Sequence, residues 1–167
     1  LLEGLAGTQT VITVGTKPDD DDPKDFTVVP VASDINLRYD DWVEGNRQKV
    51  LEASGGKIGY LHVPSTAVWG LVEFARQFYP QARMEGLIVD VRYNSGGWMP
   101  ILFTDRLGRR ISSMWGERYG RVNPFPVSAP VGHMACIING YAGSGGDAFP
   151  FFFRQSCLLY TSPSPRD

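Results

Sequence analysis

Apolar residues gather in short runs that predict a sheet of mainly parallel strands. The segments 86–92 (GLIVDVR) and 131–138 (VGHMACII) are apolar almost throughout, which is typical of strands covered on both faces in the centre of a sheet. We therefore expect these two segments to be neighbouring parallel strands. Shorter strands are predicted at 57–63, 10–15 and 26–31.

Helices are predicted between these strands. Apolar side chains recur at helical spacing over 34–54 and again over 65–79, where Pro80 is expected to end the helix. Two further helical segments are expected at 98–107 and 148–154, and an irregular segment rich in Arg, Gly and Pro at 109–127.

This alternation of strands and helices predicts an α/β fold with a mainly parallel core sheet. Right-handed crossovers bring the carboxyl ends of parallel strands to one edge, where open α/β sheets usually carry their chemistry. Glycine-rich turns follow the two most apolar strands, at 93–97 (YNSGG) and 139–147 (NGYAGSGGD). We expect these two turns to lie side by side.

Composition narrows the class of protein. The chain has 167 residues, of which 43% are hydrophobic, enough for about one domain with a packed core. The charge balance of 16 Lys+Arg against 18 Asp+Glu argues against a nucleic-acid partner and against a polybasic membrane-surface protein. No apolar run approaches the ~18 residues of a membrane-spanning helix. No cofactor or metal is expected, because no His, Cys, Asp or Glu cluster has metal-ligand spacing.

The ends of the chain carry less structure. The segment 17–25 (KPDDDDPKD) is interpreted as an acidic linker, because it lacks the ligand spacing of a calcium loop. Residues 157–167 (CLLYTSPSPRD) resemble the translation of a transposase-type sequencing adapter, so we expect them to pack against nothing. We expect a cytoplasmic protein, although a periplasmic or secreted location stays open because the chain begins at Leu1 without an initiator methionine.

Ser144 is the candidate nucleophile. It precedes a predicted helix, where exposed N–H groups and the helix dipole favour negative charge. A serine placed there can attack a carbonyl, and backbone N–H groups can bind the oxyanion that forms. The turn lacks the first glycine of a G-x-S-x-G elbow, where it has Ala142, and it lacks the lysine of a phosphate-binding loop. The serine could instead simply cap the helix.

Other candidate residues are less informative. The turn 94–97 could supply a second backbone N–H that faces Ser144, or it could be a plain strand exit. Either His62 or His133 could be a base, because imidazole titrates near neutral pH, yet a single histidine in a strand is more often structural. Cys136 lies in an apolar run and implies no disulfide framework.

Four segments together form a more specific pattern: 58–64 (IGYLHVP), 73–81 (EFARQFYPQ), 86–97 (GLIVDVRYNSGG) and 139–155 (NGYAGSGGDAFPFFFRQ). In this order they resemble tricorn-type serine proteases, which belong to the carboxy-terminal-processing protease group. The resemblance implies a crotonase-like, Clp-protease-like core of ββα units, of which residues 26–156 would form a part. Residues 1–16 resemble the last strand of a PDZ-type domain, which precedes this half of the core in the family.

The resemblance also implies roles for individual residues. Ser144 would be the nucleophile, and the N–H of Gly145 would supply one oxyanion donor. Gly96, in preference to Gly97, would supply the other donor, and Gly97 would contact the substrate. The family usually has Asp in place of Gly145 and also in place of Ser65. The backbone N–H of residue 145 is present with either glycine or aspartate at that position.

Two groups of the family's active site lie outside this chain. The general-base histidine precedes the PDZ-type domain, and a supporting glutamate follows the nucleophile helix, whereas His62 matches a strand position that is not the base. We therefore expect this chain to be nearly inactive by itself, because activation of the serine by its base is a large effect. The full-length protein is expected to cleave peptides as a homo-oligomer.

Two other classes of protein remain open. A crotonase-like acyl-CoA enzyme shares the paired backbone donors but needs no nucleophilic serine. A non-catalytic peptide-binding module descended from a protease would keep the fold and lose the missing base.

Overall fold

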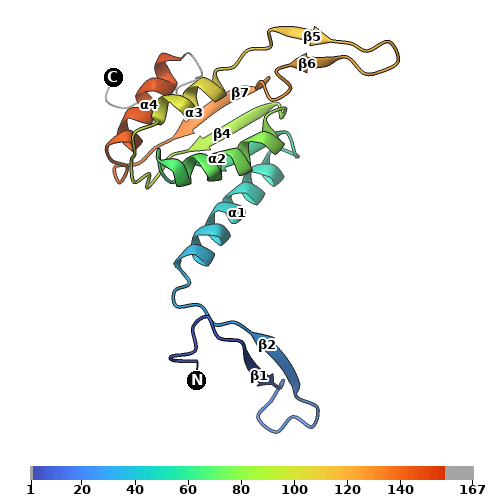
Figure 1. Cartoon of the computed structure of the whole chain (residues 1–167), viewed down its shortest axis with the longest axis vertical. Helices are drawn as coiled ribbons and strands as arrows, with labels where there is room; N and C mark the ends of the chain where they lie inside the picture. Colours follow the sequence, from blue (N-terminus) through green and yellow to red (C-terminus); the bar gives the residue numbers. More distant parts are fainter. Residues whose placement is uncertain (1, 157–167) are drawn as a thin grey trace. The chain divides into compact units, whose positions relative to one another are not determined.

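The structure is a computed structural model that describes residues 2–156, so the expectation for residues 157–167 lies outside the described residues. The chain divides into two compact units, residues 1–42 and 43–167 (Figure 1). The elements in chain order are β1 (Thr10–Val14), β2 (Lys24–Val28), α1 (Ile35–Ala53), β3 (Ile58–His62), α2 (Val68–Gln81), β4 (Gly86–Asp90), α3 (Pro100–Leu107), β5 (Ser113–Trp115), β6 (Asn123–Phe125), β7 (His133–Ile137) and α4 (Gly145–Gln155).

The first unit contains an antiparallel hairpin of β1 and β2, in which Thr10 pairs with Val28 and Val14 with Lys24. The Thr13 hydroxyl donates to Asp25 Oδ1 at 2.7 Å across the two strands. Most of the acidic segment 17–25 forms the loop of this hairpin, and its last two residues already belong to β2.

The second unit is built on a parallel sheet with the strand order β3-β4-β7. Gly86 of β4 pairs with Ile58 on one side and with His133 on the other, so the prediction that the two apolar segments are neighbouring parallel strands is confirmed. The prediction that both lie in the sheet centre is wrong for β7. Within the described residues β7 pairs with β4 alone, and alternate residues such as Ala135 are exposed.

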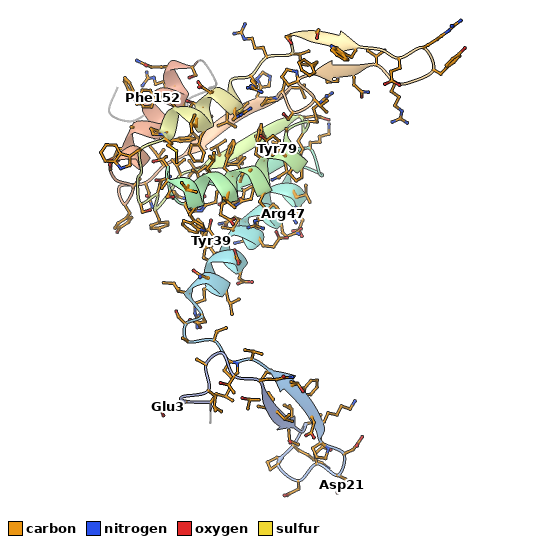
Figure 2. All side chains as sticks on the ribbon, in the orientation of Figure 1. Glu3, Asp21, Tyr39, Arg47, Tyr79 and Phe152 are labelled. Atoms are coloured by element: carbon orange, nitrogen blue, oxygen red, sulfur yellow. The ribbon has the colours of Figure 1, made fainter. Side chains whose placement is uncertain are left out.

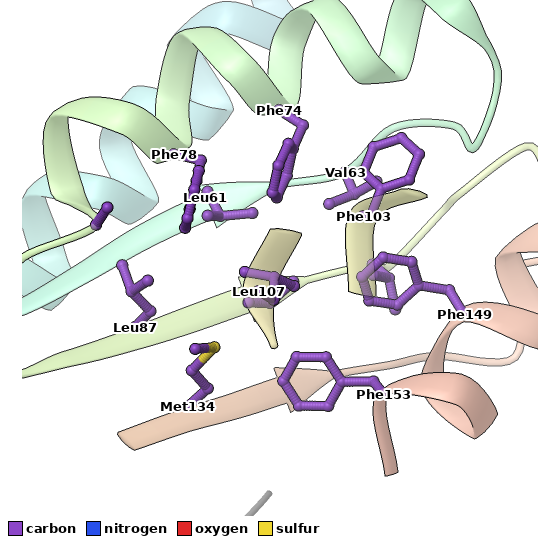
Figure 3. Packing of buried hydrophobic residues seen from close by; sticks show 13 residues of the cluster. Leu61, Val63, Phe74, Phe78, Leu87, Phe103, Leu107, Met134, Phe149 and Phe153 are labelled. Carbon is purple, nitrogen blue, oxygen red and sulfur yellow. The ribbon is translucent and has the colours of Figure 1, made fainter. Parts of the chain in front are cut away.

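Helices α2, α3 and α4 supply the hydrophobic core on one face of this sheet (Figure 3). Phenylalanine rings form a continuous chain: Phe74 stacks on Phe78 at 4.9 Å between centroids, and Phe103 contacts both Phe74 (5.2 Å) and Phe149 (6.0 Å). These rings meet Leu61 and other side chains from the sheet, so the aromatic residues of three helices fix how those helices lie on it.

Side chains alternate along each strand, and the opposite face of the sheet carries the buried polar side chains of Tyr60, His62 and Asp90 toward the carboxyl ends of β3 and β4. Asp90 is fully buried there, and its carboxylate accepts from the Tyr60 hydroxyl (2.7 Å) and from Arg92 Nη2 (2.6 Å). The side-chain amide of Asn46 in α1 donates to the Tyr60 hydroxyl at 3.4 Å. The buried carboxylate therefore has the ion pair and hydrogen bonds that its burial requires.

Three details of secondary structure differ from the predictions. Helix α2 continues through Pro80 to Gln81, because a proline in the last turn removes few helical hydrogen bonds. Helix α4 begins at Gly145, three residues earlier than predicted. The segment 109–127 is not irregular throughout, because it contains the β5–β6 hairpin, whose side chains Figure 2 draws as sticks. Trp115 of this hairpin is exposed.

Candidate active site

Three turns meet at the carboxyl edge of the sheet, directly after β3, β4 and β7. The N–H of Thr66 donates to the Gly96 carbonyl, and the N–H of Met99 donates to the Thr66 carbonyl, both at 2.9 Å. The N–H of Gly143 donates to the Asn94 carbonyl at 3.1 Å and joins the third turn to the second. The prediction that the two glycine-rich turns lie side by side is therefore confirmed.

A second contact joins the same two turns on their exposed side. Asn139 Oδ1 accepts hydrogen bonds from the N–H groups of Tyr93 (3.1 Å) and Tyr141 (3.2 Å). The two tyrosine rings stack with their centroids 5.6 Å apart. This contact was not predicted, because it depends on a side chain that reaches across 46 residues of sequence.

Ser144 has an unusual backbone conformation for a residue other than glycine. Its φ is +55° and its ψ is −120°, directly before the first residue of α4. Such a conformation costs about 1–3 kcal/mol and is commonly found at functional sites. The side chain makes no capping hydrogen bond with the helix, so the alternative that Ser144 is simply a helix cap is not supported. The residue is exposed, which leaves its hydroxyl accessible.

Glycine is required where these turns touch. A Cβ added to Gly96 would lie 2.9 Å from the Ser144 Cβ and 3.3 Å from the Gly145 nitrogen, so the two turns are in direct contact. A Cβ on Gly145 would overlap the Gly97 carbonyl oxygen and the Thr66 hydroxyl. That hydroxyl is buried and has no hydrogen-bond partner within the described residues. The structure therefore brings Ser144, Gly145, Gly96 and Gly97 together, as the sequence predicted.

The hydrogen bonds do not favour Gly96 over Gly97 as an oxyanion donor. The Gly96 N–H donates to Asn94 Oδ1 at 2.8 Å, so it is already engaged. An asparagine side chain commonly accepts the N–H two residues further on, and this local turn was not recognised in the sequence. In the part of the chain that the structure describes, the N–H groups of Gly97 and Gly145 have no hydrogen-bond partner.

Neither histidine is placed as a base for Ser144. His133 begins β7, whereas Ser144 follows its other end, and a five-residue strand spans about 13 Å. His62 is 2% exposed, and its Nε2 lies 2.8 Å from the Arg92 carbonyl oxygen. Burial lowers the pKa of His62, which favours a neutral structural imidazole. Burial also raises the pKa of Cys136 to about 12, so its thiol stays protonated and is a poor nucleophile.

The lowered pKa of His62 predicts how stability depends on pH. The unfolded chain binds a proton at His62 below the ordinary pKa of about 6.5, while the folded chain binds it only at lower pH. The contribution of His62 to the free energy of unfolding should therefore be constant above pH 7 and fall as the pH drops below 6.5. Urea unfolding followed by circular dichroism at pH 7.5, 6.0 and 5.0 measures this. His62→Gln should flatten the dependence. A dependence that survives in His62→Gln would contradict the assignment.

Residues 2–156 contain neither a metal-binding cluster nor a membrane-spanning helix. No group of three or more His, Cys, Asp or Glu side chains is arranged to hold a metal ion. In the same residues, no helix combines the length and apolar character needed to cross a membrane.

Comparison with known proteins identifies the family. Residues 57–159 match peptidase family S41, and the chain belongs to this family. It is 38% identical over 155 residues to the tricorn protease of Thermoplasma acidophilum, covering 93% of this chain and 14% of that protein. It is also 38% identical over 147 residues to tricorn protease homolog 1 of Streptomyces coelicolor, covering 88% of this chain and 14% of that protein.

The fold is similar to that of a solved tricorn protease. The crystal structure of the tricorn protease matches with a TM-score of 0.82 and 38% sequence identity, covering 92% of this chain and 15% of that one. The chain thus spans about one seventh of the length of these relatives. The mixed α/β fold predicted from the sequence and the resemblance to tricorn-type serine proteases are confirmed.

Proposed function

We propose that the protein containing this chain is a serine peptidase that cleaves peptides by acyl transfer through Ser144. The observation that carries the proposal is the contact between Ser144 and Gly96, which brings an exposed, strained serine beside two unengaged backbone N–H groups. Those N–H groups belong to Gly97 and Gly145, and we assign the oxyanion hole to them. Two such donors, aimed at the charge that develops, are the usual requirement of acyl transfer.

The reaction begins when Ser144 Oγ forms a bond to the carbon of the scissile carbonyl and passes its proton to a general base. The carbonyl oxygen becomes an oxyanion that accepts from the N–H groups of Gly97 and Gly145. Collapse of this intermediate breaks the C–N bond, and the leaving amine takes up the proton. Water then repeats the same steps, which releases the acid and restores the serine.

The general base is proposed to come from outside this chain, as the family resemblance implies. His62 is buried and His133 lies at the other end of its strand, so neither is a good candidate. This supports the proposal that the 167-residue chain by itself has almost no activity, and that the full-length protein supplies the missing histidine and glutamate.

We propose that residues 43–156 form part of a larger crotonase-like, Clp-protease-like core and that the hairpin of β1 and β2 ends a PDZ-type domain, because β2, which the sequence assigned to the core, pairs with β1 in the first unit. Partly exposed apolar side chains on the second face of the sheet support a larger core. A hollow of about 420 Å³ near the amino ends of the strands is lined by apolar side chains that include Ile58, Ile88 and Ala135. The full-length protein is further proposed to be a cytoplasmic homo-oligomer, which cell fractionation and sedimentation would test.

A fluorophosphonate probe tests the proposed function directly. The full-length protein should be labelled at Ser144, as located by mass spectrometry, because the probe reacts with activated serines. Ser144→Ala should lose the label, while Ser95→Ala, an exposed serine in the neighbouring turn, should keep it. A crotonase-like acyl-CoA enzyme or a non-catalytic binding module would remain unlabelled, and that result would contradict the proposal.

A further inference from the structure

Asn94 connects all three turns of the candidate active site. Its side-chain Nδ2 donates to the Val63 carbonyl at 2.8 Å, and its Oδ1 accepts from the Gly96 N–H at 2.8 Å. Its own carbonyl accepts from the Gly143 N–H at 3.1 Å. Residue 94 therefore contacts the exit of β3, its own turn and the nucleophile turn at the same time.

The side chain of Asn94 is buried and hydrogen-bonded at both ends. The residue is 0% exposed, and both ends of its amide are bonded to backbone groups. A Cβ added to Gly146 would lie 2.7–2.9 Å from the carbonyl oxygen, Oδ1 and Cβ of Asn94, so the first turn of α4 packs directly against it. A buried amide that is satisfied at both ends fixes the position of the groups that it joins.

From this arrangement we infer that Asn94 is the positioning residue of the oxyanion hole: its amide holds the Gly96 N–H away from the site and thereby presents the N–H of Gly97 beside that of Gly145. The inference rests on the proposed function. Asn94 itself does not touch the reacting atoms. Its contribution is the spacing of two donors on different turns, and displacement of one such donor costs about 10²–10³ in kcat.

The substitution Asn94→Asp tests the inference, because it replaces the side-chain amide with a carboxyl group whose hydrogen-bonding pattern depends on pH. An ionised aspartate at position 94 can still accept the hydrogen bond from the Gly96 N–H. It loses the hydrogen bond to the Val63 carbonyl, because a carboxylate oxygen takes the place of the Nδ2 donor and repels the carbonyl oxygen. A protonated carboxyl group has both a donor and an acceptor and reproduces the amide pattern. Burial makes protonation of this carboxyl easier than in water, where the pKa is about 3.9.

We would measure kcat for a fluorogenic peptide with the full-length wild type and the full-length Asn94→Asp variant, each at pH 8.0 and at pH 5.5. The result at each pH is the ratio of the variant's kcat to the wild-type kcat. At pH 8.0 we expect kcat to fall by about 10²–10³ with KM changed less than threefold, as for loss of an oxyanion donor. The ratio should rise at least about tenfold at pH 5.5 as the carboxyl protonates. Both partners of the Asn94 side chain are backbone groups, so the new carboxyl group is the titrating group that distinguishes the variant from the wild type.

The affinity for a peptide boronic acid separates positioning from stability, because the tetrahedral boronate adduct uses the oxyanion hole and the ground-state substrate does not. Asn94→Asp should weaken boronate binding at pH 8.0 by about the same factor as kcat/KM. Asn123→Asp is the matched control. It makes the same exchange and adds the same charge at an exposed residue of β6, outside the three turns of the site. Its kcat should change less than threefold.

Asn94→Ser keeps the inference testable if Asn94→Asp does not fold. The serine hydroxyl accepts from the Gly96 N–H but cannot reach the Val63 carbonyl, so we expect kcat and boronate affinity to fall by about tenfold. Unchanged boronate affinity in either folded variant would overturn the inference while the proposed function stands. A wild-type protein without Ser144-dependent activity would instead overturn the proposed function and the inference together.

Discussion

Replacement of Ser144 by alanine in the full-length protein should remove nearly all peptidase activity. Attack by the serine and proton removal by its base act as one unit, so loss of the hydroxyl leaves only substrate binding and oxyanion stabilisation. In well-studied serine proteases this residual is about 10³–10⁴ over the uncatalysed rate. The measurement is kcat with a fluorogenic peptide, and Ser95→Ala is the control that changes a serine of the adjacent turn.

The same replacement in the isolated 167-residue chain should change nothing measurable, because the chain is expected to lack its base. Two results would contradict this account. If the isolated chain cleaves peptides rapidly and His62→Ala stops it, then the base is local and His62 is not structural. If the full-length protein keeps its activity with alanine at 144, the nucleophile is another group and a crotonase-like mechanism becomes the better proposal.

Gly97→Ala should damage both stability and catalysis. The added Cβ would overlap the carbonyl carbon of Thr66 and the nitrogen of Ala67, and the φ of +141° is strained for alanine. We expect the free energy of unfolding to fall by about 1–3 kcal/mol from the overlap and by a similar amount from the strain. Displacement of the Gly97 N–H should lower kcat by about 10²–10³ in the molecules that remain folded.

Gly140→Ala is the matched control for Gly97→Ala. Gly140 lies in the nucleophile turn, a Cβ there would meet nothing within 4 Å, and its φ is not positive. This variant should keep wild-type activity and unfold at the same urea concentration. Urea unfolding and peptide hydrolysis on both full-length variants check these expectations. Wild-type kcat in Gly97→Ala would show that Gly97 is not an oxyanion donor.

Several features of this protein follow from local sequence alone. The unbroken apolar run of β4 predicts a buried strand, because only a strand covered on both faces can carry apolar side chains on both. Helical spacing of apolar residues predicts α1 and α2. The glycine-rich turns after β4 and β7 predict where the site lies, because parallel strands bring their carboxyl ends to one edge.

Other features depend on groups that are far apart in sequence. The sequence pattern does not show that β7 is half-exposed, since the exposure of each face of a strand depends on which elements pack against that face. The β5–β6 hairpin contains Pro124 and few alternating apolar residues, so its pairing is visible only in three dimensions. In the sequence, Asp90 is typical of a residue at the end of a strand. Only the structure shows that its carboxylate is buried and bonded to Tyr60 and Arg92.

The sequence by itself determined which serine and which glycines meet, because a strand-to-helix turn with AGSGG and a strand exit with NSGG leave few alternatives. Only the tertiary structure decided which glycine has an available N–H. Asn94 engages Gly96, and that bond is secured by the Val63 carbonyl, 31 residues away in sequence. Backbone N–H groups look alike in a sequence, and their availability depends on which acceptor the fold brings within hydrogen-bond distance.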